Sequence, residues 1–506
     1  MKARSNGIIL SYLNTFLSMI CGLFLSSFLL KQIGDTDYGI YQSMASFANY
    51  LVLLEFGTGT VIARNISICR AKGDSIETIE ENISTIWTVT AFLSIVILLV
   101  SVIFCINIDT IYAHSLTCEQ QVLGKKIFIV ITVYLLASFI AQTLRGIPLS
   151  FEDYSFSPKI SIFRTSVKTT LLVVLMLKLP EAIIIALVDA GLAILISVYT
   201  FLYCQKKFKI SINFRKFRFS IFKSALPFCI AIFLQAIVNQ ANNNIGKFIL
   251  SIKLGPEEVA LYSVGMYIYS IFSSITTIPV SMYLPQITGE VTKGKNGIDL
   301  TQKLVQPSRL IVLIGGTILF GFISAGKPFI SLVYGPEYML SWQIAIILMV
   351  PMFINMTTAP IINVLDVLNK RLVRSGVLFI CAILNIILTL YLSEKYGLAG
   401  IALATGVCLM IGQVFIMNIY YAKVIDIKVG YLYVNAYKGI VFYQIIGAFT
   451  AYILAENIKN NFFSFILSGI IYVLISFGGY FIKGITADER KLICGLINKI
   501  NSRINT

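Results

Sequence analysis

Two cations one helical turn apart lie within an otherwise apolar stretch, SPKISIFRTSVKTTLLVV. They are Arg164 and Lys168, which share one face of a helix. A charge at the centre of a membrane helix costs about 2.5–3.5 kcal/mol on insertion scales, so such residues normally face a bundle interior or water. Placed in this way they can bind a dense anion, and arginine can do so in bidentate fashion. The alternative is structural: Arg164 extends to the membrane boundary, and Lys168 pairs with Asp189 of IIIALVDAGLAILI.

Three further charged residues lie in these apolar stretches and are candidates for function. Lys247 lies late in the seventh apolar stretch, and Arg145 lies near the predicted cytoplasmic end of the fourth, where each could pass a bound anion on. Glu55 lies in the second stretch, within LVLLEFGTGTVIAR. Glu55 and Asp189 could titrate as ion-coupling carboxylates or act as structural partners of Arg or Lys, and the structural role is favoured. The coupling ion stays open.

The seventh apolar stretch also carries a row of amides, in FLQAIVNQANNNIGKFIL. Gln235, Asn239, Asn242 and Asn243 stand at i, i+4, i+7 and i+8, so they form one stripe on a helix. Amides between helices can be packing contacts worth about 0.6–2 kcal/mol each. Four within three turns favour the wall of a wetted cavity that takes a hydroxyl-rich ligand. Asn14 of the first stretch is predicted to extend this lining.

No catalytic constellation is visible in the sequence. It has no nucleotide-binding P-loop and no spacing typical of metal ligands. The single histidine, His114, falls in a predicted outward loop, and the nine cysteines contain no CxxC pair. We therefore expect a protein that is not an enzyme and has neither a cofactor nor a metal site.

Apolar stretches long enough to cross a bilayer position these residues. Of 506 residues, 57% are hydrophobic and only 13% are charged. About 20 apolar residues at 1.5 Å rise match the hydrocarbon core. The sequence predicts an all-α polytopic membrane protein with about fourteen transmembrane helices, at 7–30, 38–62, 83–107, 124–147, 157–178, 181–204, 222–250, 259–284, 305–326, 339–365, 373–393, 397–421, 433–454 and 462–483.

Positive charge is concentrated in alternate connections. The loop CQKKFKISINFRKFRFSIFK contains seven Lys and Arg residues and no acid. Because positive residues stay on the cytoplasmic side, this loop orients the protein and both termini are predicted to be cytoplasmic. The formal net charge of +16 could suggest nucleic acid, but the basic residues lie in short loops between helices. We expect contact with membrane lipid and none with nucleic acid.

The chain contains an internal repeat. KQIGDTDYGIYQS aligns with IKLGPEEVALYSV when Gly34 is placed on Gly255, an offset of 221 residues. LKLPEAIIIAL (177–187) aligns with EKYGLAGIALA (394–404) at an offset of 217. Six spans separate the copies, which predicts two six-helix lobes, 1–210 and 211–425, related by a pseudo-twofold axis along the membrane normal. Residues 426–506 would add two transmembrane helices and a cytoplasmic tail.

In LLKQIGDTDYGIYQS, LLEFGTGTVIARNIS, LGPEEVALYSVGMYIYSI and EKYGLAGIALATGV, the chain resembles the polysaccharide flippases. These form a branch of the multidrug/oligosaccharidyl-lipid/polysaccharide exporter superfamily. The resemblance implies alternating access by the two lobes in the bacterial inner membrane. The implied cargo is an undecaprenyl-diphosphate-linked oligosaccharide repeat unit for O-antigen, capsule or exopolysaccharide. It further implies a positively charged cavity, and a polysaccharide polymerase and a chain-length regulator as candidate partners.

Three other functions stay open. A lipid II flippase shares the fold, but that branch carries charges within the first span, whereas this chain has none between Gly7 and Leu30. A multidrug exporter typically has twelve spans. A membrane polysaccharide polymerase would need a substantial outward loop with catalytic groups, and the longest outward connection here covers only about residues 108–123.

Overall fold

The computed structural model describes residues 2–208, 213–368, 370–486 and 489–490. Side chains are described for these residues except at 2–9, 215, 231, 234–235, 238–239, 241–244, 281, 284–285 and 371–372. The chain divides into two compact units, residues 1–263 with 389–401 and residues 264–388 with 402–506. We call them unit 1 and unit 2. The described residues form helices and no strand.

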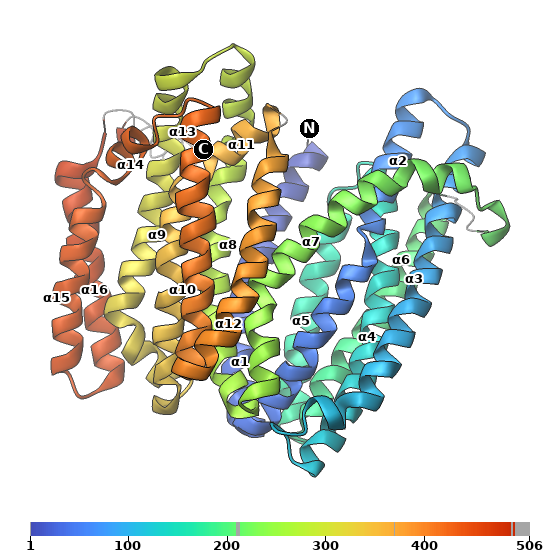
Figure 1. Cartoon of the computed structure of the whole chain (residues 1–506), viewed down its shortest axis with the longest axis horizontal. Helices are drawn as coiled ribbons and strands as arrows, with labels where there is room; N and C mark the ends of the chain where they lie inside the picture. Colours follow the sequence, from blue (N-terminus) through green and yellow to red (C-terminus); the bar gives the residue numbers. More distant parts are fainter. Residues whose placement is uncertain (1, 209–212, 369, 487–488, 491–506) are drawn as a thin grey trace, which may run out of the picture. The chain divides into compact units, whose positions relative to one another are not determined.

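Unit 1 is built from seven helices, coloured blue to green in Figure 1, and from short parts of two further helices. A short 3-10 turn, Val52–Glu55, separates the first two helices, and another, Phe214–Lys216, precedes the seventh. The helices are α1 (Lys2–Leu51), α2 (Thr58–Lys72), α3 (Ile76–Ile111), α4 (Cys118–Ser150), α5 (Phe156–Met176), α6 (Ala182–Phe208) and α7 (Phe219–Lys253).

Unit 2 holds most of the second half of the chain, coloured from green to red in Figure 1. Two of its helical segments, Leu409–Ile416 and Tyr480–Gly484, are π-helical, and Pro336–Tyr338 is a 3-10 turn. The helices are α8 (Pro256–Thr292), α9 (Gly297–Val333), α10 (Met339–Thr357), α11 (Pro360–Val367), α12 (Arg371–Cys408), α13 (Met417–Val424), α14 (Val429–Tyr437), α15 (Val441–Asn457) and α16 (Asn461–Gly479). The first residues of α8 and residues 389–401 of α12 belong to unit 1.

The predicted fold class is confirmed, and each of the fourteen predicted spans lies mainly on helical residues. Among the described residues, nine helices are long and apolar enough to cross a membrane, or ten if the bent pair α14–α15 is one span. Two of these stretches, Leu10–Lys72 with 63 residues and Val373–Val424 with 52, each contain two predicted spans. One crossing needs only about 20 residues, so both stretches are long enough for two. Two predicted spans are not among these apolar helices. They are α5, which carries Arg164 and Lys168, and α7.

Three spans predicted as continuous are interrupted. The span 38–62 breaks where Phe56 and Gly57 both adopt positive φ, 48° and 66°. The span 339–365 breaks before Pro360, which lacks the backbone N–H needed inside a helix. The span 433–454 breaks at Gly439, with φ 74°. Hydropathy alone does not report such breaks, because the residues that make them are themselves compatible with an apolar segment.

Both alignments of the internal repeat coincide with breaks in the helices. Gly34 has φ 77°, outside the helical range, and the aligned Gly255 lies between α7 and α8. Pro180 lies between α5 and α6, and the aligned Gly397 interrupts α12 with φ 55°. The repeat is therefore supported by local structure in each half. The predicted domain boundaries at 210 and 425 stay a prediction.

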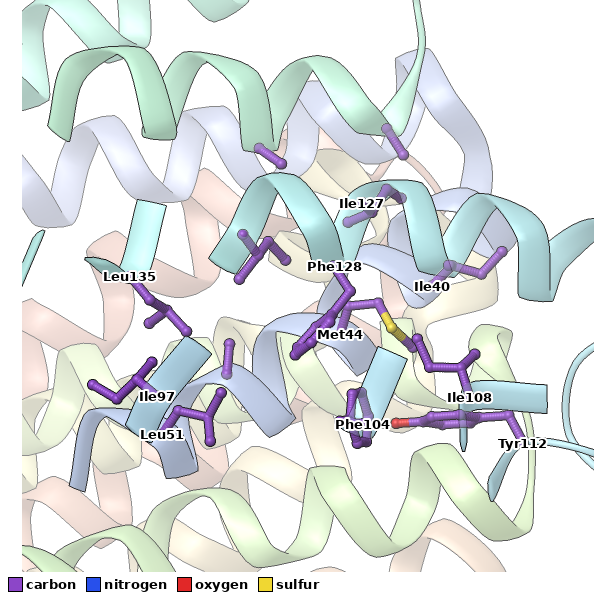
Figure 2. Packing of buried hydrophobic residues seen from close by; sticks show 14 of the residues in the cluster. Ile40, Met44, Leu51, Ile97, Phe104, Ile108, Tyr112, Ile127, Phe128 and Leu135 are labelled. Atoms are coloured by element: carbon purple, nitrogen blue, oxygen red, sulfur yellow. The ribbon is translucent and has the colours of Figure 1, made fainter. Parts of the chain in front are cut away.

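A hydrophobic core holds α1, α3 and α4 of unit 1 together (Figure 2). Met44 of α1 and Phe128 of α4 are fully buried, and Phe104 of α3 is almost so. Phe47 of α1 stacks on Phe104 with ring centroids 3.5 Å apart. Side chains of this kind bury 150–250 Å² each and dominate core energetics. Their packing fixes α1 and α4, two of the helices that carry the polar residues described below.

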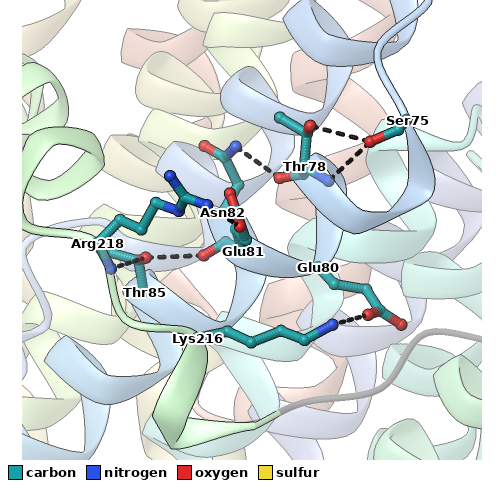
Figure 3. A network of polar contacts seen from close by, with 8 residues as sticks. All are labelled: Ser75, Thr78, Glu80, Glu81, Asn82, Thr85, Lys216 and Arg218. Atoms are coloured by element: carbon teal, nitrogen blue, oxygen red, sulfur yellow. Dashed lines mark hydrogen bonds and ion pairs between the residues drawn. The ribbon is translucent and has the colours of Figure 1, made fainter.

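The basic loop before α7 is held against α3 by ion pairs (Figure 3). Lys216 Nζ lies 2.6 Å from Glu80 Oε2, and Arg218 Nη2 lies 2.5 Å from Glu81 Oε1. The backbone N–H of Arg218 also donates to Thr85 Oγ1 at 3.0 Å. The hydrogen bond to Glu80 raises the pKa of Lys216. Two of the seven cations on which the predicted orientation rests are therefore ion-paired to acidic residues near the start of α3.

Candidate functional site

A polar cavity of about 460 Å³ lies within unit 1, among α1, α4, α5 and α6. Its five charged lining residues are Glu55, Arg145, Arg164, Lys168 and Asp189. The sequence singles out all of these. Lys247, the other charged residue singled out within an apolar stretch, does not line the cavity. The polar residues of its lining are Tyr41, Gln42, Asn49, Glu55, Tyr134, Ser138, Gln142, Arg145, Arg164, Lys168 and Asp189.

Asp189 joins the two cations of α5. Its Oδ2 lies 2.8 Å from Lys168 Nζ, and its Oδ1 lies 3.4 Å from Arg164 Nη2. The four-residue spacing on α5 places both cations on the face that meets Asp189 of α6. The side chain of Asp189 is 8% exposed, whereas those of Arg164 and Lys168 are 31% and 26% exposed. Both cations are therefore accessible from the cavity while the carboxylate that they share is enclosed.

Two tyrosines complete this cluster. Arg164 Nη2 donates to the hydroxyl of Tyr134 at 3.2 Å, and the guanidinium carbon lies 5.3 Å from the Tyr134 ring centroid. The hydroxyl of Tyr41 donates to Asp189 Oδ2 at 3.5 Å, a long contact. Tyr41 comes from α1 and Tyr134 from α4, so residues of four helices meet in this cluster. Sequence reasoning missed both tyrosines, although Tyr41 is a matched position of the internal repeat.

Arg145 and Glu55 lie where the first cavity adjoins a second one of about 180 Å³. Both residues line both cavities, together with Gln142. The Nε of Arg145 is buried and has no hydrogen-bond partner among the residues that the structure describes. The second cavity is otherwise lined mainly by the first turn of α2 and the end of α4.

The glycines beside Arg145 let α2 and α4 approach closely. A side chain at Gly59 would overlap with the carbonyl oxygen of Gln142, and one at Gly146 would overlap with that of Gly59. The helix break at Phe56 and Gly57 directs the start of α2 to this contact. Phe56 is a non-glycine residue with positive φ, a conformation that such residues rarely adopt. Rare backbone conformations of this kind are common at functional sites.

The other predicted site residues are placed as follows. Asn14 is half-buried in α1, and its Oδ1 has no hydrogen-bond partner within the described part of the chain. Lys247 is half-buried in α7. Neither residue lines the two cavities described above. The side chains of Gln235, Asn239, Asn242 and Asn243 lie outside the described residues, so the amide stripe on α7 stays a prediction.

The charge balance of the larger cavity favours an anionic ligand. Its lining contains the cations Arg145, Arg164 and Lys168 and the carboxylates Glu55 and Asp189. The pairing of Lys168 with Asp189 expected for a structural role is present, and Asp189 also pairs with Arg164. Because both cations remain accessible, this pairing does not prevent them from binding an anion. In the described residues, no three His, Cys, Asp or Glu side chains are grouped as metal ligands would be.

A polytopic helical membrane protein with a cation-rich internal cavity is the class that this fold and site define. The family model described as "Polysaccharide biosynthesis protein" matches residues 5–288, more than half of the chain. The chain belongs to this polysaccharide biosynthesis family, as its sequence resemblance predicts.

Solved structures of transporters share the fold. The lipid II flippase MurJ, in an inward closed conformation, matches with a TM-score of 0.73 and 17% identity, covering 93% of this chain and 99% of that one. An inward-facing multidrug resistance MATE family transporter of the MOP superfamily matches with a TM-score of 0.58 and 13% identity, over 81% and 95%. A Vibrio cholerae MATE transporter gives 0.54 and 13%, over 81% and 94%. A search of curated protein sequences gave no match.

Proposed function

We propose that this protein is a flippase that moves undecaprenyl-diphosphate-linked oligosaccharide repeat units across the bacterial cytoplasmic membrane. The glycan would serve O-antigen, capsule or exopolysaccharide assembly. Membership of the polysaccharide biosynthesis family supports a role in that pathway, and a fold shared with a lipid II flippase and MATE transporters supports movement across a membrane. The observation that carries the proposal is the cavity in which Arg164, Lys168 and Arg145 outnumber the carboxylates.

The cavity cations match the chemistry of this cargo. The only dense charge of a lipid-linked oligosaccharide is its diphosphate, and an unpaired anion is strongly disfavoured in a low-dielectric interior. Arg164 and Lys168 provide charge-assisted hydrogen bonds to it, and Arg145 provides a third cation along the same cavity. The predicted amide stripe of α7 would meet the hydroxyl-rich glycan, and the polyprenyl chain would remain among membrane lipids.

The proposed transport cycle is alternating access. Two six-helix lobes, 1–210 and 211–425, would open the cavity in turn to the cytoplasmic and the outer side, with both termini cytoplasmic. Reporter fusions after Arg218 and at Thr506 should then read as cytoplasmic, and one within residues 108–119 should read as external. An external signal at Thr506 would contradict the orientation.

A lipid II flippase is the second candidate. The match to MurJ, with a TM-score of 0.73, favours it over a multidrug exporter. Lipid II also carries a diphosphate, so the cavity cations suit both cargoes. The absence of charged residues between Gly7 and Leu30 favours the oligosaccharide cargo, because the lipid II branch carries charges in its first span.

Deletion of the protein in its host tests the proposal. Lipid-linked repeat units should accumulate on the cytoplasmic leaflet, and surface polysaccharide should be lost, while peptidoglycan synthesis continues. Accessibility of the glycan to a lectin in right-side-out and inverted vesicles measures the leaflet. Loss of the repeat unit itself would indicate a synthetic enzyme, and arrest of peptidoglycan synthesis would indicate the lipid II function.

A further inference from the structure

The carboxylate of Asp189 is an acceptor already engaged with the cations that would receive the cargo. It contacts Lys168 at 2.8 Å, Arg164 at 3.4 Å and the Tyr41 hydroxyl at 3.5 Å. It is nearly enclosed, whereas the two cations are accessible from the cavity. An anion that binds there therefore shares its cations with a fixed negative charge that belongs to the protein.

The engagement of Arg164 is incomplete. Both of its contacts, to Asp189 and to the Tyr134 hydroxyl, are made by Nη2, and its contact to Asp189 is long. A guanidinium has five N–H donors and an ammonium has three. Within the described residues, donors of Arg164 thus remain for an entering phosphate while Asp189 stays in place. The carboxylate does not block the site, but it lowers the positive potential that a phosphate meets there.

We propose that Asp189 limits the affinity of the cavity for a diphosphate so that the cargo is released. This inference rests on the proposed function. A carrier must bind its cargo well enough to admit it and weakly enough to let it leave, and two unopposed cations would hold a diphosphate tightly. Asp189 cancels one of their two charges. It acts through Arg164 and Lys168 and is therefore a positioning and tuning residue of the transport site.

Binding of a prenyl diphosphate to the full-length protein provides the test. The probe is farnesyl diphosphate, with farnesol as the matched probe that lacks the diphosphate, and the protein is held in nanodiscs of phosphatidylcholine. Asp189→Asn keeps the size of the side chain and removes its charge. It should bind farnesyl diphosphate at least about tenfold more tightly and release it correspondingly more slowly, because a charge a few ångströms away acts strongly in a partly buried site. Farnesol binding should not change.

Two further variants control for charge and folding. Glu80→Gln removes a carboxylate from another lysine pair of unit 1, outside the cavity, so it makes the same change in net charge and should leave binding unaltered. In a Lys168→Gln background, Asp189→Asn restores the net charge of the wild-type cluster. Because this double variant removes both members of the Lys168–Asp189 pair, it leaves neither charge without its partner, and we expect it to fold. It should bind the probe more tightly than Lys168→Gln alone.

Export in cells gives the second readout. Asp189→Asn should export more slowly than the wild type although it binds more tightly, a combination that a purely structural role of Asp189 does not produce. Unchanged or weaker binding in both backgrounds would overturn the inference, and so would tighter binding with export at the wild-type rate. If Arg164→Ala and Lys168→Ala bind the probe as the wild type does, the proposed diphosphate site itself fails. If they lose binding while Asp189→Asn gains none, only the tuning role fails.

Discussion

An arginine in each unit is paired with a carboxylate, and the two pairs differ in how completely the arginine is satisfied. In unit 2, Arg309 is 5% exposed and donates to Glu489 at 2.7 Å through Nε. Its Nη1 donates to the carbonyls of Asn435 and Lys438, and its Nη2 donates to that of Gly484. Every nitrogen of this guanidinium is engaged.

The arginine of unit 1 has the opposite character. Arg164 is 31% exposed, faces a cavity and makes both of its polar contacts through Nη2. Arg309, whose donors are all used by the protein, fixes structure, because the carbonyls that it binds lie near the start and the end of the α15–α16 pair. A cation left partly unsatisfied beside a cavity can bind a ligand. The number of engaged donors, together with burial, separates the two roles.

The internal repeat extends the comparison to equivalent positions. At the offset of 217 residues, Arg164, Lys168 and Asp189 correspond to Cys381, Asn385 and Gly406. These three counterparts in unit 2 are neutral and buried, and Thr405 Oγ1 donates to Asn385 Oδ1 at 3.4 Å. The repeat thus preserves the helices and their breaks, while the charged chemistry appears in one copy only.

The largest expected effect is on export. Arg164→Ala and Lys168→Ala should each reduce surface polysaccharide about tenfold or more, since a hydrogen bond to a charged group is worth about 1.5–3 kcal/mol. Arg164→Lys, which keeps the charge, should retain partial activity. Cys381→Ala and Asn385→Ala, at the equivalent positions, should export normally. Quantitative blotting must show all five variants at normal levels in the membrane. Normal export by both alanine variants of unit 1 would break the comparison.

The second prediction concerns stability. Arg309→Ala should lower the free energy of unfolding by about 3–5 kcal/mol, because it leaves Glu489 and several carbonyls without their buried partner. Arg164→Ala should change it by no more than about 1 kcal/mol, since Lys168 still pairs with Asp189. Thermal unfolding of the purified variants in detergent measures both. Equal losses of stability would show that Arg164 is structural as well.

The third prediction transfers the acid of unit 1 to its equivalent position. A Cβ atom on Gly406 would lie 3.0 Å from the carbonyl oxygen of Ile347 and 3.5 Å from Pro351. Gly406→Asp therefore combines a steric conflict with a buried carboxylate, and it should destabilise by more than about 3 kcal/mol. Gly191→Ala is the control, because no atom lies within 4 Å of its added Cβ. Wild-type stability of Gly406→Asp would mean that unit 2 can hold an acid at this position.

The sequence was sufficient for the fold class and for part of the site. Hydropathy places the spans because a bilayer leaves few alternatives to apolar helices. The four-residue spacing of Arg164 and Lys168 puts them on one face wherever the helix packs, and a nearby acid such as Asp189 is their natural partner.

Other parts of the site depend on tertiary packing. Tyr41 and Tyr134 reach the cluster only because α1 and α4 pack together, and nothing local in their surroundings indicates this. The break at Phe56 was also not predictable, since a phenylalanine with positive φ is imposed by its environment. Asp153 illustrates the same point outside both clusters: it follows α4, yet its partners Tyr203 and Lys207 come from the end of α6.

The smallest expected effect concerns the Asp153–Lys207 ion pair and the pH dependence of its contribution to stability. Burial alone would raise the pKa of Asp153, but hydrogen bonds from Lys207 and Tyr203, both at 2.6 Å, hold it below its usual range. Because the folded-state pKa is the lower one, the contribution to stability is complete above the unfolded value of about 3.9 and is lost as the pH falls through the folded value. Asp153→Asn should therefore lower stability at pH 7 and pH 5 by the same amount, less than about 1 kcal/mol for so exposed a lysine.

Thermal unfolding of the wild type and Asp153→Asn at pH 7, 5 and 3 measures this contribution. The difference between the two proteins should be constant from pH 7 to pH 5 and should shrink at pH 3, below the unfolded pKa, because the carboxylate of the unfolded chain takes up its proton first. Export at neutral pH should stay normal, because the Asp153 pair lies outside both cavities. A strong export defect in Asp153→Asn would show that charge in unit 1 acts beyond the Arg164–Lys168–Asp189 cluster, and the contrast with Arg309 would then no longer separate binding from structural cations.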